Sequence, residues 1–145
     1  MGRRRRGREY ALQMLFQMDL SGDAPEGVFV EFWAGQPDAA VEVRTFAEDL
    51  ARGAWAFREE LDLAITACAD NWRLERMAAV DRNVLRLAAF ELLHRPDTPA
   101  AVVIDEAIEV VRKYGSEQSA RFVNGILDGL KRRVECGDLR AGDGG

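Results

Sequence analysis

Apolar residues recur every three or four positions along most of the chain, the spacing that places them on one face of an α-helix. This spacing predicts helices over residues 9–20, 28–33, 41–71, 81–93, 99–114 and 117–133. The longest of them contains Gly53, near which a bend is expected. Because no segment alternates apolar and polar residues as a strand does, the predicted fold is all-α, with six or seven helices in a helical bundle around one core.

Residues that begin or end helices support these limits. Asp81 is a predicted N-cap, and Thr98 is another, because Pro99 after it fits the first turn of a helix. Gly115 is expected to end one helix and Ser116 to cap the next. The predicted limits therefore do not depend on apolar spacing alone.

The segment FVNGILDGL, residues 122–130, carries two conflicting signals. Asn124 followed by Gly125 is a strong turn signal, because both residues tolerate positive φ. The apolar residues around this pair nevertheless keep helical spacing, at Val123, Ile126, Leu127 and Leu130. We therefore expect a continuous helix. Within it, Gly125 costs about 1 kcal/mol relative to Ala and lets another helix or a ligand approach closely.

Composition indicates a globular protein that needs neither a metal nor a cofactor. Hydrophobic residues make up 48% and charged residues 31% of the 145 residues, so the chain can bury a core. No apolar run approaches the roughly 20 residues that span a bilayer, and none follows the basic N-terminus as in a secretory signal. Cys68, Cys136 and His94 are too few for a zinc site. These observations indicate a reduced, cytoplasmic, metal-free protein.

The formal net charge of −5 hides an asymmetry. Residues 1–8, MGRRRRGR, hold five of the 20 basic residues and no acidic one, which leaves 15 basic against 25 acidic residues elsewhere. This segment, the basic arm, is predicted to be flexible and to precede a single helical domain over residues 9–134. Residues 135–145 are polar and glycine-rich and are predicted to be a disordered tail. An arginine-dense arm on an acidic body suits local contacts with phosphates.

Evidence for catalysis is weak. The chain has no nucleophile elbow, phosphate-binding loop, zinc-protease motif or glycine-rich dinucleotide turn. Adjacent acidic residues such as Asp105 and Glu106 point in different directions on a helix, so they do not form a carboxylate pair. His94 precedes Arg95 and Pro96, where it is expected to bind carbonyls at a helix end. We therefore predict that the protein is not an enzyme.

Two features favour nucleic-acid binding. The arginines of the basic arm can each neutralise a phosphate, and guanidinium planes also stack on exposed bases. Near the start of the last predicted helix, Gln118 and Phe122 share a face and Arg121 is adjacent. An amide, an aromatic ring and an arginine at a helix start form a candidate base-stacking platform. The pattern leaves an alternative open, in which Phe122 widens the core stripe.

Three segments carry a resemblance to a known family: RRRRGREYALQMLFQMDL, NWRLERMAAVDRNVLRLAAFELL and DTPAAVVIDEAIEVVRKYGSEQSARFVNGILDGL. In this order, from about Arg3 to Leu130, they resemble NusB, the bacterial transcription antitermination factor family. The most specific parts are the basic arm before ALQxLF, the VDRxxLRLAxxEL helix, the DEAIE helix and the ending KYGxxxSxxFVNGILD. The resemblance implies an all-helical fold of two three-helix sub-bundles.

The resemblance also implies RNA binding and protein partners. Members of this family bind boxA, a single-stranded RNA element in ribosomal RNA operon transcripts. They do so as a heterodimer with the small-subunit ribosomal protein that acts as Nus factor E. The complex joins elongating RNA polymerase and the other Nus factors and suppresses premature termination. Some members form homodimers that cover the RNA-binding face.

Motif positions transfer the site residues of the family to this chain. The RNA-binding residues that the resemblance implies are Arg4, Arg5, Arg6, Arg8, Phe16, Gln118, Arg121 and Phe122. The implied contact with the ribosomal protein is an acidic surface that includes Asp81 and Glu106. An acidic body for a basic protein and an arginine arm for RNA fit the uneven charge of the chain.

The chain departs from the family pattern at three places. Gly7 is expected to make the arm more mobile than Ala would, and residues 21–40 and the tail match nothing that we recognise. Two other interpretations stay open. One is a helical adaptor that binds no RNA. The other is a stand-alone relative of the NusB-like domain of ribosomal RNA cytosine methyltransferases, although the cofactor-binding α/β domain of those enzymes has no counterpart in this sequence.

Overall fold

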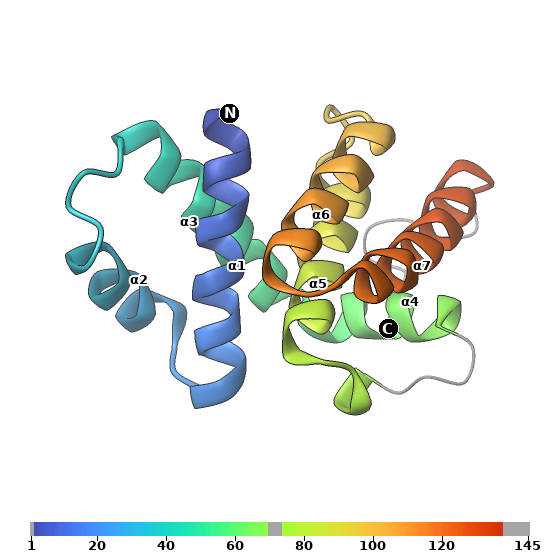
Figure 1. The fold of residues 1–145 in the computed structure, drawn as a ribbon, viewed down its shortest axis with the longest axis horizontal. Helices are drawn as coiled ribbons and strands as arrows, with labels where there is room; N and C mark the ends of the chain where they lie inside the picture. Colours follow the sequence, from blue (N-terminus) through green and yellow to red (C-terminus); the bar gives the residue numbers. More distant parts are fainter. Residues whose placement is uncertain (1, 70–73, 138–145) are drawn as a thin grey trace. The chain divides into compact units, whose positions relative to one another are not determined.

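Helices make up all the regular structure in the computed structural model, which describes residues 2–69 and 74–137 (Figure 1). They are α1 (Arg3–Ser21), α2 (Pro25–Ala34), α3 (Val41–Ala56), α4 (Arg58–Cys68), the short 3₁₀ helix η1 (Leu74–Arg76), α5 (Ala79–His94), α6 (Ala100–Tyr114) and α7 (Glu117–Glu135). The predicted all-α fold is confirmed. The chain divides into two compact units at Ala56 and Phe57, with α1–α3 in the first and α4–α7 in the second. Most of the predicted disordered tail, residues 138–145, lies outside the described residues.

The first unit is a three-helix bundle in which each helix packs against the other two. Its core contains Leu12, Met14, Leu15, Met18, Val28, Phe29, Ala47, Leu50 and Ala54. Tyr10 of α1 meets Phe32 and Trp33 of α2 edge-to-face, with ring centroids 5.5 and 5.3 Å apart. Trp33 also donates a hydrogen bond from Nε1 to Glu48 Oε2 of α3, at 2.6 Å. The segment 21–40, which matches no family motif, therefore supplies the helix that completes this core.

α1 begins at Arg3, six residues before its predicted start at Glu9, so the arginines of the basic arm are helical. Gly7 is buried in this helix, and a Cβ added to it would lie 2.5 Å from Cδ2 of Phe46 in α3. The ring of Phe46 thus rests directly on the backbone of α1. Gly7 has a packing role that the sequence did not reveal, while the flexibility of the arm stays a prediction.

The long helix predicted over residues 41–71 is wrong: α3 ends at Ala56 and α4 begins at Arg58. The break is at Phe57 (φ −102°, ψ 17°) rather than near Gly53, which lies inside α3. The ring of Phe57 stacks on His94, with centroids 4.3 Å apart. Glu59 follows in the first turn of α4, where an acidic side chain suits the positive end of the helix dipole.

α5 is the central helix of the second unit and packs against α4, α6 and α7. Its apolar residues, among them Leu85, Ala89 and Phe90, are almost fully buried. Arg86 is also buried, and its guanidinium binds both carboxylate oxygens of Asp62 in α4, at 2.8 and 2.9 Å. This bidentate pair offsets the desolvation of the charge and fixes α4 against α5.

Two of the predicted helix starts are corrected, and the prediction for α7 is confirmed. Asp81 is the third residue of α5, whose N-cap is Ala78, and α6 begins at Ala100, after Pro99 rather than Thr98. Ser116 caps α7 as predicted, because its Oγ accepts a hydrogen bond from the backbone N–H of Ser119 at 3.0 Å. Short polar residues thus predict where a helix begins to within one or two residues, but they do not always identify the N-cap residue.

α7 runs without interruption through Asn124 and Gly125, so the segment FVNGILDGL is helical as predicted. Gly125 is exposed, and among the described residues no atom lies within 4 Å of a Cβ added there. No described helix therefore approaches it closely, which corrects one of the two roles expected for this glycine. The close contact is one turn further on, at Gly129, where an added Cβ would lie 3.5 Å from Cβ and Sγ of Cys68.

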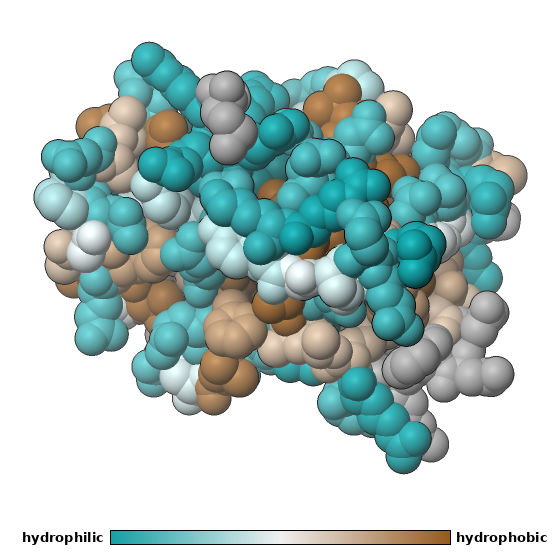
Figure 2. Space-filling view, in the orientation of Figure 1, coloured by the Kyte–Doolittle hydropathy of each residue, from teal (hydrophilic) through white to brown (hydrophobic). Residues whose placement is uncertain are grey.

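Hydrophilic side chains cover most of the face seen in Figure 2, and hydrophobic ones lie in smaller areas between them. This distribution agrees with helices whose apolar stripes are turned inward. Within residues 2–69 and 74–137, no helix combines the length and the apolar character that crossing a membrane requires.

Two glycine substitutions should affect stability in opposite directions. Gly125→Ala should raise the free energy of unfolding by about 1 kcal/mol, because the site is open and Ala favours helix. Gly7→Ala should lower it by about 1–2 kcal/mol, because the ring of Phe46 must move off α1. Urea unfolding of both variants measures the difference. Destabilisation by Gly125→Ala would mean that a neighbour does pack on this glycine.

Candidate nucleic-acid interface

The arginines of the basic arm lie against aromatic rings of the first unit. Arg4 and Arg8, one helical turn apart on α1, have their guanidinium carbons 5.4 and 5.5 Å from the centre of the Phe46 ring. Arg6 stands over Tyr10 in the same way, at 5.5 Å. These cation–π contacts hold the guanidinium groups in place at the start of α1.

The arginines differ in exposure. Arg4 and Arg6 are exposed and Arg5 is half-buried, whereas only 6% of the Arg8 surface is exposed. Phe16, further along α1, is half-buried. Arg8 is thus buried against Phe46, whereas Arg4 and Arg6 are exposed to solvent.

The location of these charges is unfavourable for the free helix. The N-terminal end of a helix carries a partial positive charge, and α1 has no acidic residue in its first turn and no side-chain cap. Four consecutive arginines there repel both the dipole and one another. A bound anion would relieve this repulsion, as anions commonly do at helix N-termini.

A pocket of about 210 Å³ lies at the start of α7 in the second unit. Its lining comes from η1, α5, α7 and the residues between them: Arg76, Met77, Ala78, Asp81, Ser116, Gln118, Ser119 and Phe122. We call it the Phe122 pocket. Phe122 is half-buried at its wall, a position that is neither full core nor open surface.

A chain of hydrogen bonds leads from the cap of α7 to the carboxylate in this pocket. The hydroxyl of Ser116 donates to Ser119 Oγ at 3.3 Å, and Ser119 Oγ donates to Asp81 Oδ2 at 3.1 Å. Asp81 is 7% exposed, and its second oxygen, Oδ1, is buried and has no hydrogen-bond partner among the described residues. Burial raises the pKa of the Asp81 carboxyl above its ordinary value, and the hydrogen bond from Ser119 partly opposes this effect.

The structure brings together some of the predicted site residues and separates others. Gln118, Phe122 and Asp81 share the Phe122 pocket, although Asp81 was expected on a protein-binding surface. Arg121 is exposed on α7 but does not line the pocket, and Glu106 is half-buried on α6. Sequence reasoning missed Ser119, whose role depends on a partner 38 residues away.

A statistical model of the NusB family matches residues 5–132 of this chain. The chain belongs to the NusB family.

Relatives of known name and structure agree with this assignment. The chain is 48% identical over 135 residues to the transcription antitermination protein NusB of Koribacter versatilis, which covers 93% of this chain and 92% of the relative. It is 53% identical over 126 residues to NusB of Anaeromyxobacter dehalogenans, with 87% and 88% covered. Among solved structures, NusB of T. maritima has a TM-score of 0.82 at 36% identity, covering 94% and 97%.

A second solved structure contains partners as well. It holds the antitermination factors NusB and NusE in complex with dsRNA. The matched chain in it has a TM-score of 0.82 to this one at 29% identity, with 91% of this chain and 98% of that chain covered. The family resemblance is therefore confirmed. The chain forms two sub-bundles as the resemblance implies, but only the first has three α-helices, and the second has four, α4–α7.

Replacing Asp81 should change how stability depends on pH. A raised pKa means that the folded protein binds this proton more tightly than the unfolded chain, so stability falls as pH rises from about 4 through the raised value. Asp81→Asn removes this loss. Its free energy of unfolding should therefore improve relative to the wild type as pH increases from about 4 to 7. Asp97→Asn, which removes an exposed carboxyl, is the control, and parallel profiles for both variants would contradict the prediction.

Proposed function

We propose that this protein is a transcription antitermination factor that binds boxA-type single-stranded RNA of ribosomal RNA operon transcripts. It does so with the small-subunit ribosomal protein that acts as Nus factor E. In the cytoplasm, the pair joins the other Nus factors and RNA polymerase in the elongation complex and suppresses premature termination. The protein acts by binding and not by catalysis.

The observation that carries this proposal is the unpartnered carboxylate oxygen in the Phe122 pocket. A buried acceptor without a hydrogen bond is costly, so a ligand that donates to Asp81 Oδ1 is favoured. Unpaired bases present such donors, the amino groups of adenine, cytosine and guanine. They also stack on aromatic rings, which Phe122 offers at the wall of the same pocket. In this role Asp81 accepts a hydrogen bond from a base, instead of contacting the ribosomal protein.

The start of α1 suits the phosphates of the same kind of ligand. Arg4 and Arg6 are exposed on a helix end that repels cations, and Arg5 lies between them. Single strands are commonly bound by such a basic path together with aromatic stacking. Arg8 contributes by supporting Phe46, with Phe16 further along the helix.

Protein partnership is supported by charge and by similarity. Apart from the basic arm the chain has 15 basic against 25 acidic residues, which favours a basic partner such as a ribosomal protein. A similar chain was solved together with NusE. Glu106 on α6 is the residue that we assign to this contact. Because that complex contains dsRNA, the experiment below includes a duplex.

Affinity for RNA should depend on the basic arm and on salt. We expect the protein with Nus factor E to bind boxA RNA more tightly than a scrambled RNA, with a log–log salt slope of roughly −0.7 per phosphate contacted. Arg4→Gln with Arg6→Gln should reduce that slope by about 1.4. The melting temperature should not fall, because both side chains are exposed and their charges are unfavourable at the start of α1. Fluorescence anisotropy across a salt series measures the affinities and the salt slope, and thermal unfolding measures the melting temperature.

Three results would contradict the proposal. Equal affinity for boxA and scrambled RNA would remove the specificity. Tighter binding to a boxA duplex than to the single strand would exclude the single-stranded target. Complex formation with Nus factor E that neither includes nor responds to RNA would favour the helical adaptor.

Phe122 should matter for RNA binding more than for stability. Phe122→Ala should lose about 1–3 kcal/mol of RNA-binding free energy, because a base no longer stacks on the ring. Phe122→Leu keeps apolar volume without a ring and should lose a similar amount, whereas Phe122→Tyr should bind nearly as the wild type does. If Phe122→Leu restores binding, the ring acts as core and not as a platform.

A further inference from the structure

α7 carries a second stripe of residues beside its core stripe. The core stripe consists of Ala120, Val123, Ile126, Leu127 and Leu130, all buried. The second stripe, here the open stripe, consists of Gln118, Phe122, Gly125, Gly129, Arg132 and Arg133. From Gln118 to Gly129 its members are three or four residues apart, and Arg132 and Arg133 follow Gly129 by three and four residues. They therefore lie on one face of the helix, with the two arginines at its opposite edges. This face begins at the Phe122 pocket and continues towards the C-terminal end of α7.

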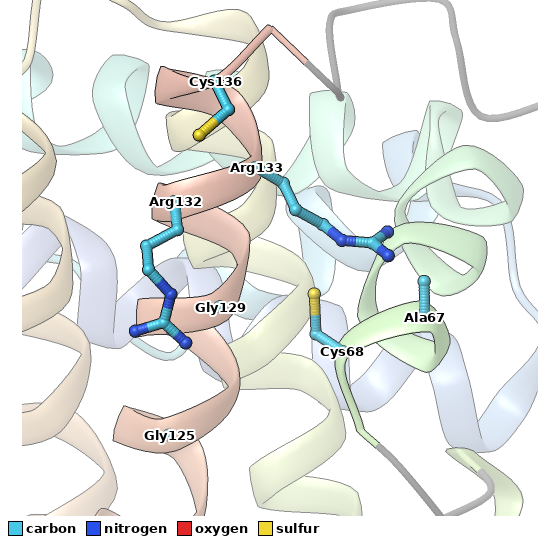
Figure 3. Close-up of a pocket in the computed structure, with 7 residues that line it drawn as sticks. All are labelled: Ala67, Cys68, Gly125, Gly129, Arg132, Arg133 and Cys136. Carbon is cyan, nitrogen blue, oxygen red and sulfur yellow. The ribbon is translucent and has the colours of Figure 1, made fainter.

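A pocket lies at the far end of the open stripe. It has a volume of about 380 Å³ and is formed by Ala67 and Cys68 of α4 with Gly125, Gly129, Arg132 and Arg133 of α7 (Figure 3). Gly129 rests on Cys68 and thereby brings the two helices together, but Gly125 has no described neighbour within 4 Å of an added Cβ. Two glycines one turn apart weaken a helix. At Gly125, no described side chain from another helix covers the backbone where the pocket opens.

The charges at this pocket are all of one sign. Arg133 extends towards α4 and Ala67, and Arg132 leaves α7 on the other side of the glycines (Figure 3). Among the described residues neither guanidinium has a hydrogen bond or an ion pair, and no acidic residue lines the pocket. Asp128 is exposed nearby on α7, at the edge of the open stripe. Arginines in a last turn often bind the terminal carbonyls, but no such bond is present among the described residues.

We propose that the open stripe is a path for RNA, along which the strand that enters the Phe122 pocket passes over Gly125 and then beside Cys68, which packs on Gly129. Arg132 and Arg133 bind its phosphates at the far end. The proposal rests on the proposed function and extends it to a second contact region. The missing side chain at Gly125 lets the strand lie against the helix there, and the two guanidinium groups flank it with planar donors that match phosphate oxygens. Gly125 then has a ligand in place of a protein neighbour.

The length of the path sets the design of the test. Phe122 and Arg133 are separated by about 17 Å along α7, a span on the order of five nucleotides at roughly 3.4 Å each. The RNAs are a boxA core and the same core with six added uridines at the 5′ or at the 3′ end. The protein is the full chain with Nus factor E.

Arg133→Glu and Lys131→Glu are the matched variants. Both reverse one charge near the end of α7, but Lys131 lies about 160° around the helix from Arg133, outside the open stripe. The wild type should bind one of the extended RNAs more tightly than the core, with a salt slope steeper by about 1.4 for two phosphates. Arg132→Glu and Arg133→Glu should bind the core as the wild type does but should no longer bind the extended RNA more tightly than the core. Lys131→Glu should still prefer the extended RNA. Gly125→Leu should also lose the gain, because its side chain fills the path.

Three outcomes would contradict the path. In the first, neither extension raises the affinity of the wild type. In the second, Arg133→Glu and Lys131→Glu reduce the affinity for the extended RNA equally, and in the third, Arg133→Glu weakens binding of the core itself while its melting temperature is unchanged. Competition by uridine monophosphate alone at the extended segment would indicate a free-nucleotide site instead. The two proposals fail differently. If boxA and scrambled cores bind equally, the proposed function fails and the path with it, whereas a preferred core without a gain from extension removes only the path.

Discussion

The turn between α6 and α7 depends on the absence of a side chain at Gly115. A Cβ there would lie 2.9 Å from the carbonyl oxygen of Val111, a contact that the backbone cannot relieve by a rotamer change. Without it, the backbone N–H of Gly115 bonds that carbonyl at 2.7 Å, and α7 begins two residues later. Ser116 is thereby placed to cap α7, and Ser119 reaches Asp81 on α5. This turn therefore positions the part of the Phe122 pocket that α7 supplies, including Ser116 and Ser119.

Three features of this chain depart from local rules. The arginines at the start of α1 oppose the helix dipole, and Gly125 weakens α7 without close packing. Asp81 keeps one buried oxygen that has no donor among the described residues. In contrast, the buried guanidinium of Arg86 binds both carboxylate oxygens of Asp62. Natural sequences tend to violate such rules at functional sites, where a ligand supplies what the protein lacks. The RNA that we propose as the ligand would supply negative charge at the start of α1 and a hydrogen-bond donor for Asp81.

Gly7 and Gly125 show how a glycine in a helical sequence can be misread. Gly7 stands among arginines and suggests a loose arm, but it is the place where Phe46 packs on α1. Gly125 stands among apolar residues and suggests close helix packing, but the nearest helix contact is at Gly129. Sequence shows that a side chain is absent at each position. It does not show which part of the molecule, or which ligand, approaches the space.

Helical periodicity by itself determined the class of the fold, the central and C-terminal helices and the core face of α7, because apolar spacing and capping act over a few residues. Motifs in order along the chain determined the family. Tertiary structure decided where the helix of residues 41–71 breaks, since Phe57 carries no local breaker signal and stacks on His94, which is distant in the sequence. It also decided that Asp81 joins Phe122 in one pocket and that Arg8 is buried. These features depend on contacts between residues far apart in the chain, and no local pattern records such contacts.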